Sequence, residues 1–398
     1  SLQSRNRRLV EACFPNVRRN PDKAYWYNLY PWDGTFTKQI LGLERRTGNV
    51  VWKQTARYGF PQKSIAVGSG KVFAIDRVEI DRDRYLKSRG TPLPSNPAIR
   101  AFDARSGEQL WAVNRDVLGY HLMYCLDQDI LIQPSSHDPD PRGWSRKKRK
   151  QWVRLIAYRG SDGTVLWDNK LELERSSGRH RMWWNWFVHR DTIVVESYYD
   201  SHADFYGFDL RTGKRKTRRS ALTGAEVPWG FRRRGGCTKN LCSENLVFFR
   251  SSTAGYYDAK HDAGTVNLAG FRTGCKNSLI PAGGILNAPN YASGCTCNYP
   301  VFTALALVHM PDVETWTTST WTYDGAPVKR VGVNLGAPGD CRSPSGTLWL
   351  DYPSVGGLSP DIPIAGVPDK IECFYRHSAR MKGGPMPQVT SSGAEGLE

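Results

Sequence analysis

The sequence predicts an all-β protein folded as a β-propeller of about seven blades (six to eight), each with four strands. Three observations support this prediction. One hairpin pattern recurs along the first half of the chain, and its copies lie roughly 50 residues apart, which is typical of propeller blades. The composition agrees, because the 398 residues include 14 Trp, 18 Tyr and 38 Gly, and short apolar runs rich in aromatic residues favour strands.

Each copy of the hairpin has an alternating strand, a tight turn that ends in glycine, and a second strand that ends in tryptophan. Clear copies occupy residues 41–52, 100–111 and 156–167, and a degenerate copy at 206–217 has Thr217 in the Trp position. The turn glycines, Gly48, Gly107, Gly163 and Gly213, lie 59, 56 and 50 residues apart. Glycine supplies the left-handed residue that such turns need. We expect each terminal Trp to pack against the next blade.

Other strands complete the predicted blades. Strand pairs precede the hairpins at 64–68 with 71–76, 121–125 with 129–133, and 183–189 with 192–198. Weaker strand patterns follow at 245–250, 255–258, 265–271, 279–287 and 303–310, and a hairpin then leads to Trp316. Six units can be counted, and the two ends of the chain could form a seventh. Polar insertions at 79–97 and 137–151 are predicted to be surface loops.

We divide the chain into a lead-in (1–36), a propeller (37–325) and a C-terminal region (326–398). The C-terminal region is an irregular β-region rich in Gly and Pro, with a strand-like segment at 347–350 and a polar tail. It is predicted to be a closing blade or a small β-appendage.

The formal net charge of +17 attracts anionic polymers, although it also serves solubility. The basic runs at 146–150, 214–219 and 232–234 match no nucleic-acid-binding motif, so nucleic acid is not the expected partner. No apolar run approaches the roughly 18 residues that a membrane helix needs. The chain starts with a polar segment and without Met. We therefore expect a mature, periplasmic or secreted protein whose leader has been removed.

Seven of the nine cysteines follow residue 236, and this clustering predicts local disulfides and an oxidising compartment. The disulfide candidates are Cys237, Cys242, Cys275, Cys295, Cys297, Cys341 and Cys373. The odd total leaves at least one thiol free or paired between chains. A metal site is the alternative, but no Cys-x-x-Cys pair or nearby His supports zinc.

The hairpin from Asp103 to Trp111 resembles the repeat of the PQQ-like propeller superfamily, which includes quinoprotein alcohol dehydrogenases and an outer-membrane assembly scaffold. Segments 236–250, 270–275, 287–291, 295–300 and 305–310 resemble bacterial, exported proteins with PQQ-binding-like propeller repeats. Together the resemblance covers about residues 37–325 and implies the fold. Quinoprotein dehydrogenases hold PQQ beneath adjacent cysteines, with Ca²⁺ bound by Glu, Asn and Asp. This chain has neither a vicinal Cys pair nor a haem-attachment motif, so PQQ with Ca²⁺ stays an unsupported alternative.

One candidate site combines side chains of the kinds that a polysaccharide lyase uses. The proposed catalytic residues are His180, His189, Tyr198 and Tyr199, because His and Tyr can remove the α-proton of a uronate. Sugar rings could stack on Trp183, Trp184 and Trp186. In the alternative interpretation the aromatic residues are blade core and the histidines are surface residues.

A second group of polar residues could line the central funnel of a propeller and bind a ligand there. It consists of Arg250, Tyr256, Arg272, Asn277, Asn287 and Tyr299. Two of them, Arg250 and Arg272, could bind a carboxylate or sulfate in bidentate fashion. The alternative is that these residues form hydrogen bonds between blades.

The leading functional hypothesis is a protein that binds an anionic or carbohydrate polymer, or a protein partner, at its funnel face. The alternatives are a polysaccharide lyase, a PQQ- or metal-dependent sugar oxidoreductase, and an assembly scaffold. Whether the chain is an enzyme, and its oligomeric state, stay open at this point.

Overall fold

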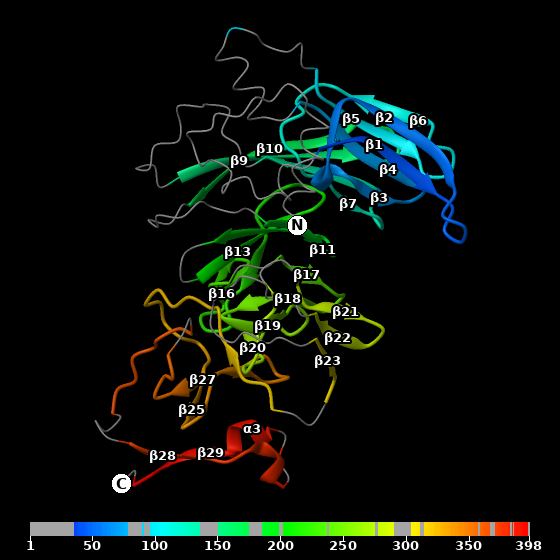
Figure 1. Ribbon diagram of the computed structural model, residues 1–398. Helices are drawn as coiled ribbons and strands as arrows, with labels where there is room; N and C mark the ends of the chain where they lie inside the picture. Colours follow the sequence, from blue (N-terminus) through cyan, green and yellow to red (C-terminus); the bar gives the residue numbers. More distant parts are fainter. Residues whose placement is uncertain are drawn as a thin grey trace. The chain divides into compact units, whose positions relative to one another are not determined.

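A computed structural model describes residues 36–78, 90, 96–135, 150–174, 185–198, 202–236, 239–274, 278–289, 304–310, 314–356, 359–366, 371–382, 384 and 386–396 (Figure 1). The regular structure of these residues is almost entirely β-strand, so the all-β prediction is confirmed. Among them, the helices are two 3₁₀ segments, Gln62–Ser64 and Ser378–Arg380, and the short α3 (Pro387–Thr390). No helix in this part of the chain is long and apolar enough to cross a membrane.

The chain forms two compact units, which we describe separately. Unit 1 contains residues 1–175 and Leu210–Gly213, and unit 2 contains 176–209 and 214–398. Most of the two predicted long loops lies outside the described residues.

Unit 1 contains one hairpin and two four-stranded antiparallel sheets whose strands follow chain order, as in propeller blades. The hairpin is formed by β1 (Phe36–Leu43) and β2 (Val50–Pro61). The first sheet contains β3 (Ala66–Gly68), β4 (Lys71–Asp76), β5 (Ala98–Asp103) and β6 (Gln109–Val113). The second contains β7 (Met123–Cys125), β8 (Ile130–Ser135), β9 (Lys150–Arg159) and β10 (Val165–Glu174). The three clear hairpin copies of the sequence are therefore β1–β2, β5–β6 and β9–β10.

The terminal tryptophan of each of these hairpins docks on the next hairpin turn, as predicted. Each indole Nε1 donates to a backbone carbonyl there: Trp52 to Ala104 (3.0 Å), Trp111 to Gly160 (3.0 Å) and Trp167 to Leu210 (3.1 Å). Each indole also lies over a turn glycine with positive φ, namely Gly107, Gly163 and Gly213. A Cβ atom added to these glycines would approach the indole rings to within 2.6–2.8 Å, so the turn glycines serve both backbone conformation and close packing.

Unit 2 contains further small antiparallel sheets of the same kind. One comprises β11 (Asn185–His189), β12 (Thr192–Tyr198), β13 (His202–Asp209) and β16 (Gly230–Arg234). The next comprises β17 (Leu241–Cys242), β18 (Leu246–Ser251), β19 (Thr253–Asp258), β20 (Thr265–Asn267) and β24 (Thr317–Thr318). A three-stranded sheet comprises β21 (Ile280–Ala282), β22 (Ile285–Ala288) and β23 (Leu305–Val308). The strand predicted at 279–287 is thus a hairpin that turns at Gly283 and Gly284.

The fourth hairpin copy is interrupted rather than degenerate. After its turn the chain leaves the sheet and forms a separate hairpin of β14 (Thr217–Arg219) and β15 (Glu226–Pro228). It returns where the Trp229 backbone N–H donates to the Lys216 carbonyl (2.8 Å), and β16 then pairs with β13. The Trp229 indole covers Gly207, as the Trp52 indole covers Gly42 in the first copy. The Trp position is therefore occupied by Trp229, after an insertion of residues 217–228.

The C-terminal part of unit 2 departs from the blade pattern. In its three-stranded sheet, β27 (Leu348–Tyr352) lies between β25 (Gly332–Leu335) and β26 (Cys341–Arg342), and β25 runs parallel to β27. A two-stranded sheet follows, formed by β28 (Glu372–Tyr375) and β29 (Ser392–Glu395). Leu222 of the insertion packs with Trp321, Leu348 and Leu350 in a buried cluster, so the insertion contributes to the core of this region.

The disulfide prediction is wrong for the three candidates that the structure describes. Cys242, Cys341 and Cys373 carry free thiols, as does Cys125. Burial raises the pKa of Cys242 to about 11 and, together with the neighbouring Asp340 side chain, that of Cys341 to about 12, so both thiols are neutral. The other candidates, Cys237, Cys275, Cys295 and Cys297, lie outside the described residues. Clustering in the sequence therefore does not imply bridging at these three positions.

Candidate functional site

The described members of the first predicted site are packed into unit 2. The His189 ring is buried at the end of β11, and its Nε2 lies 3.1 Å from the Ser243 carbonyl and 3.0 Å from the Glu244 carbonyl. Burial lowers the pKa of His189, so the neutral ring donates its Nε2 proton to these carbonyls. Trp186 is buried as well. His180, Tyr199, Trp183 and Trp184 lie outside the described residues, as does the side chain of Tyr198.

Four members of the second predicted site lie in the part of the chain that the structure describes: Arg250, Tyr256, Arg272 and Asn287. Arg250 and Arg272 are both buried, and each donates to a nearby carbonyl, Arg250 Nε to Ser252 (3.0 Å) and Arg272 Nη1 to Thr273 (3.3 Å). Burial raises the pKa of Tyr256, and Asn287 Nδ2 donates to the Ile280 carbonyl across the β21–β22 hairpin (3.2 Å). Asn277 and Tyr299 lie outside the described residues.

A fully buried ion pair crosses the β11–β16 sheet. The side chains of Glu196 and Arg233 are 0% and 1% exposed, and Arg233 Nε donates to Glu196 Oε1 at 2.9 Å. Asn185 and Asn240 each donate an amide hydrogen to Glu196 Oε2, at 2.7 and 2.8 Å. Arg233 Nη1 also donates to the Arg250 carbonyl at 2.6 Å, which joins β16 to β18. Because its hydrogen bonds are satisfied within the protein, this pair holds strands together and is closed to a ligand.

Most of the charge in the basic run 214–219 is neutralised or packed internally. Lys216 Nζ lies 2.8 Å from Asp191 Oδ1, and Arg218 pairs with Asp262. The Arg215 guanidinium lies 4.5 Å from the centroid of the Tyr206 ring, a cation–π distance. This run therefore does not form an open basic patch.

The run 232–234 differs in its last member. Arg232 Nε lies 2.8 Å from Asp204 Oδ1, and Arg233 pairs with Glu196. Arg234 is exposed, and no carboxylate of the described residues pairs with it. Its backbone is held at the end of β16, where its N–H donates to Ser251 Oγ at 2.9 Å. The Arg234 guanidinium is therefore fixed at its base and open at its tip.

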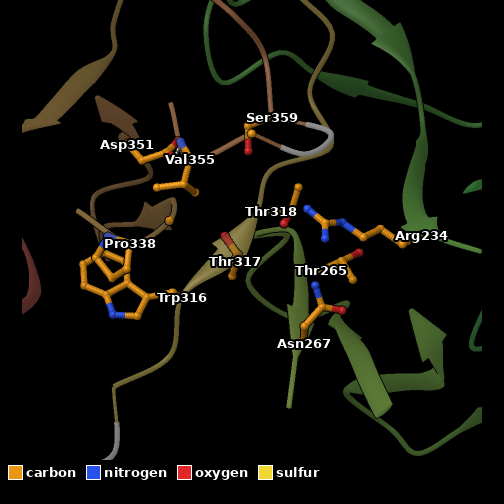
Figure 2. A pocket seen from close by; sticks show the side chains of 12 residues that line it. Arg234, Thr265, Asn267, Trp316, Thr317, Thr318, Pro338, Asp351, Val355 and Ser359 are labelled. Carbon is orange, nitrogen blue, oxygen red and sulfur yellow. Dashed lines mark hydrogen bonds between the residues drawn. The ribbon is translucent and has the colours of Figure 1, made fainter. Parts of the chain in front are cut away.

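Arg234 lies at a cavity of about 230 Å³ in unit 2 (Figure 2). Strands β16, β20, β24 and β27, the turn before β26, and the chain that follows β27 contribute its walls. The lining residues are Arg234, Thr265, Asn267, Trp316, Thr317, Thr318, Pro338, Gly339, Asp351, Val355, Gly356 and Ser359. None of the predicted site residues is among them.

The cavity has a polar and an apolar side. In Figure 2 the Arg234 guanidinium reaches toward Thr318, and Thr265 and Asn267 lie on the same side. Trp316 and Pro338 lie together on the other side of Thr317. Two charged side chains, Arg234 and Asp351, line the cavity together with polar threonine, serine and asparagine side chains and the aromatic Trp316.

Asp340 lies directly behind the cavity wall and is completely buried. Its Oδ2 accepts hydrogen bonds from the Ser319 N–H (2.9 Å) and from Ser359 Oγ (2.5 Å), and its Oδ1 accepts one from the Asp351 N–H (3.1 Å). Burial, together with the neighbouring Asp351 side chain, raises the pKa of Asp340 to about 7. Asp340 thus supports two residues that line the cavity, Asp351 and Ser359.

We expect Asp340→Asn to flatten the pH dependence of stability between pH 4 and 7. The pKa of Asp340 is raised on folding, so the folded state binds the proton more tightly than the unfolded state. The resulting stabilisation is complete below about pH 4 and is lost as the pH rises toward 7, by an amount on the order of 2–4 kcal/mol. Urea unfolding at several pH values measures this loss as wild type minus variant. A difference that is constant from pH 4 to 7 contradicts the assignment.

Among the described residues, no group of three or more His, Cys, Asp or Glu side chains is arranged to hold a metal ion.

Comparison with known proteins finds no matching family model and no matching curated protein. Solved structures that resemble the chain include BamB from Moraxella catarrhalis, with 12% identity and a TM-score of 0.33, covering 64% of this chain and 66% of BamB. Quinohemoprotein alcohol dehydrogenase ADHIIG from Pseudomonas putida HK5 has 13% identity and a TM-score of 0.28, covering 56% of this chain and 42% of the enzyme. The quinohemoprotein alcohol dehydrogenase from Comamonas testosteroni has 11% identity and a TM-score of 0.29, covering 68% and 44%.

These proteins are PQQ-like β-propellers, the group that the hairpin repeat resembles. The chain spans about two thirds of the length of BamB and less than half of each dehydrogenase. At these identities, what the similar proteins bind or catalyse is not carried over to this chain.

Proposed function

We propose that this protein binds an acidic carbohydrate and that the cavity in Figure 2 is its recognition site. The observation that carries the proposal is the open guanidinium of Arg234 across the cavity from Trp316. A guanidinium binds carboxylate or sulfate through two parallel hydrogen bonds. An indole offers a flat apolar surface for a sugar ring, and the Asn267, Thr318 and Ser359 side chains can exchange hydrogen bonds with hydroxyl groups.

The charge of the chain supports the same ligand class. A net charge of +17 raises the local concentration of a polyanion and speeds its encounter with the protein. The site therefore combines long-range attraction with local recognition of one acidic sugar unit. A periplasmic or secreted location belongs to this proposal and has no support from the three described cysteine candidates, whose thiols are free.

The cavity replaces the funnel face as the preferred site. Arg250 and Arg272 are buried, whereas Arg234 is exposed and lines a cavity of about 230 Å³. The lyase alternative is weaker at His189, because the Nε2 proton of its ring is held by two carbonyls. No described contact favours the oxidoreductase or scaffold alternatives over binding.

We expect Arg234→Ala to weaken binding of an acidic glycan about tenfold or more, because a hydrogen bond to a charged group is worth about 1.5–3 kcal/mol. The full chain is titrated with polygalacturonate, alginate and heparin by calorimetry at moderate salt. The matched control is Arg115→Ala in unit 1, whose side chain is 93% exposed and which removes the same charge. Equal losses in both variants would indicate unspecific attraction, and no binding of any of the three glycans by the wild type would refute the proposal.

A further inference from the structure

The Trp316 indole lines the cavity and forms a hydrogen bond with the Glu314 carboxylate. Trp316 Nε1 donates to Glu314 Oε2 at 3.2 Å. The Glu314 side chain is only 5% exposed, and Glu314 lies three residues before β24 in the chain. A tryptophan whose Nε1 is anchored in this way presents a defined face to the cavity.

The same carboxylate is bound by the β28–β29 hairpin. The Tyr375 hydroxyl and the Ser378 backbone N–H both donate to Glu314, and His377 Nε2 lies 3.8 Å from its Oε2. The Tyr375 ring also meets the Trp316 ring edge-on, with centroids 6.3 Å apart and planes at 72°. Glu314 and Trp316 together therefore connect the cavity wall with the C-terminal hairpin.

Hydrogen bonds supply much of the remaining attachment of this hairpin. Gln388 Nε2 donates to the Thr315 carbonyl (3.0 Å), and Ser392 Oγ donates to Asn334 Oδ1 (2.9 Å). In β28, Glu372, Cys373 and Tyr375 are exposed, and Phe374 is only partly buried. A segment with few buried apolar contacts opens at a lower free energy than the core of its domain.

We propose that the β28–β29 hairpin is a strap that, through Glu314, holds Trp316 in the orientation that the cavity needs, so that release of the strap lowers affinity for acidic carbohydrate. The inference rests on the proposed function, and it assigns Glu314 as a positioning residue. While the strap is docked, Glu314 is ionised and accepts hydrogen bonds from Tyr375 and Ser378 of the strap. Burial opposes this ionisation, but the hydrogen bonds from Tyr375, Ser378 and Trp316 outweigh it and lower the pKa of Glu314.

The test uses the full chain with three substitutions. Glu314→Ala removes the acceptor, Glu314→Gln keeps one oxygen as an acceptor, and Glu372→Ala is the matched control, because Glu372 is exposed on β28 itself. Hydrogen exchange of residues 372–396 reports release of the strap. The fluorine NMR signal of 5-fluorotryptophan at position 316, assigned with Trp316→Phe, reports the indole. Calorimetry with polygalacturonate reports affinity.

We expect Glu314→Ala to accelerate exchange in the strap, to shift or broaden the Trp316 signal, and to weaken binding about twofold to tenfold, the range for loss of one aromatic contact. Glu314→Gln should restore part of each property, and Glu372→Ala should change none of them.

Faster hydrogen exchange in the strap of Glu314→Ala, without a change in the Trp316 signal, overturns the inference whether or not the glycan binds. Unchanged affinity in Glu314→Ala, while Arg234→Ala still weakens binding, overturns the inference and leaves the proposed function in place. Absence of binding by the wild type overturns the proposed function and, with it, the claim that the strap controls affinity.

Discussion

Replacement of Glu196 by Ala should lower the free energy of unfolding of unit 2 by about 3–5 kcal/mol. The change leaves the Arg233 guanidinium, which is 1% exposed, charged and without its carboxylate. Asn185 and Asn240 also lose their acceptor. This decrease in the free energy of unfolding is larger than the stabilisation that the ion pair itself contributes, because a buried charge without a partner is strongly destabilising. Urea unfolding at pH 7, followed by circular dichroism, measures it.

Two further variants separate the buried pair from other effects. Glu244→Ala removes the same kind of side chain at a position that is 82% exposed. The ion pair of Glu244 with Arg190 is long, at 3.8 Å, so we expect the free energy of unfolding to change by less than about 0.5 kcal/mol. The double replacement of Glu196 and Arg233 by Met should cost less than Glu196→Ala alone, because no charge is left buried. If Glu196→Ala costs no more than Glu244→Ala, the pair does not stabilise unit 2.

Replacement of Trp111 by Ala should destabilise unit 1 by about 3–5 kcal/mol, the usual range for a large aromatic side chain removed from a packed site. The indole donates to the Gly160 carbonyl, covers Gly163, and lies 5.8 Å from the Phe73 ring, centroid to centroid. Its loss therefore separates two sheets as well as leaving a cavity. Thermal and urea unfolding of the full chain measure the effect on the unit 1 transition.

The neighbouring residue provides the control for Trp111. Leu110 is on the same strand and is 46% exposed, so Leu110→Ala should have a small effect. Trp111→Phe keeps part of the packing and removes the indole hydrogen bond, which we expect to cost about 1 kcal/mol beyond the loss of volume. Equal costs for Trp111→Ala and Leu110→Ala would show that the indole does not join the sheets.

The fold could be predicted where its pattern is local in sequence. The turn glycine and the following tryptophan lie four positions apart in 48–52, 107–111 and 163–167, and strand pairing in these hairpins follows directly. The same rule fails at Gly213, because residues 217–228 separate the turn from Trp229. The pairing of β13 with β16 and the contact of the Trp229 indole with Gly207 show that Trp229 occupies the repeat position, and pairing across an insertion cannot be deduced from spacing.

The candidate site could not be predicted for a related reason. Its residues come from five separate stretches of chain between Arg234 and Ser359, and none of these stretches carries a motif. The sequence shows Arg234 as one of three consecutive arginines, and only the structure shows that Asp204 and Glu196 bind the other two. Glu314 and Asp340 belong to no motif in the sequence. Their role in supporting the cavity becomes visible only in the structure, where both side chains are buried. The clustering of cysteines in the sequence is a poor guide, because Cys242, Cys341 and Cys373 are free thiols.

The tryptophan contacts of unit 1 have a direction, and this matters during synthesis on the ribosome. Each indole docks on a turn that lies later in the chain, 52, 49 and 43 residues further on. When a sheet leaves the ribosome, its last strand therefore lacks the tryptophan contact until the next hairpin has been synthesised. Assembly accordingly proceeds from the N-terminus. A truncated fragment that ends before Gly160 leaves the Trp111 indole uncovered, whereas one that extends past Gly163 closes this contact. Expression boundaries for unit 1 should accordingly follow a docking turn and not the end of a strand.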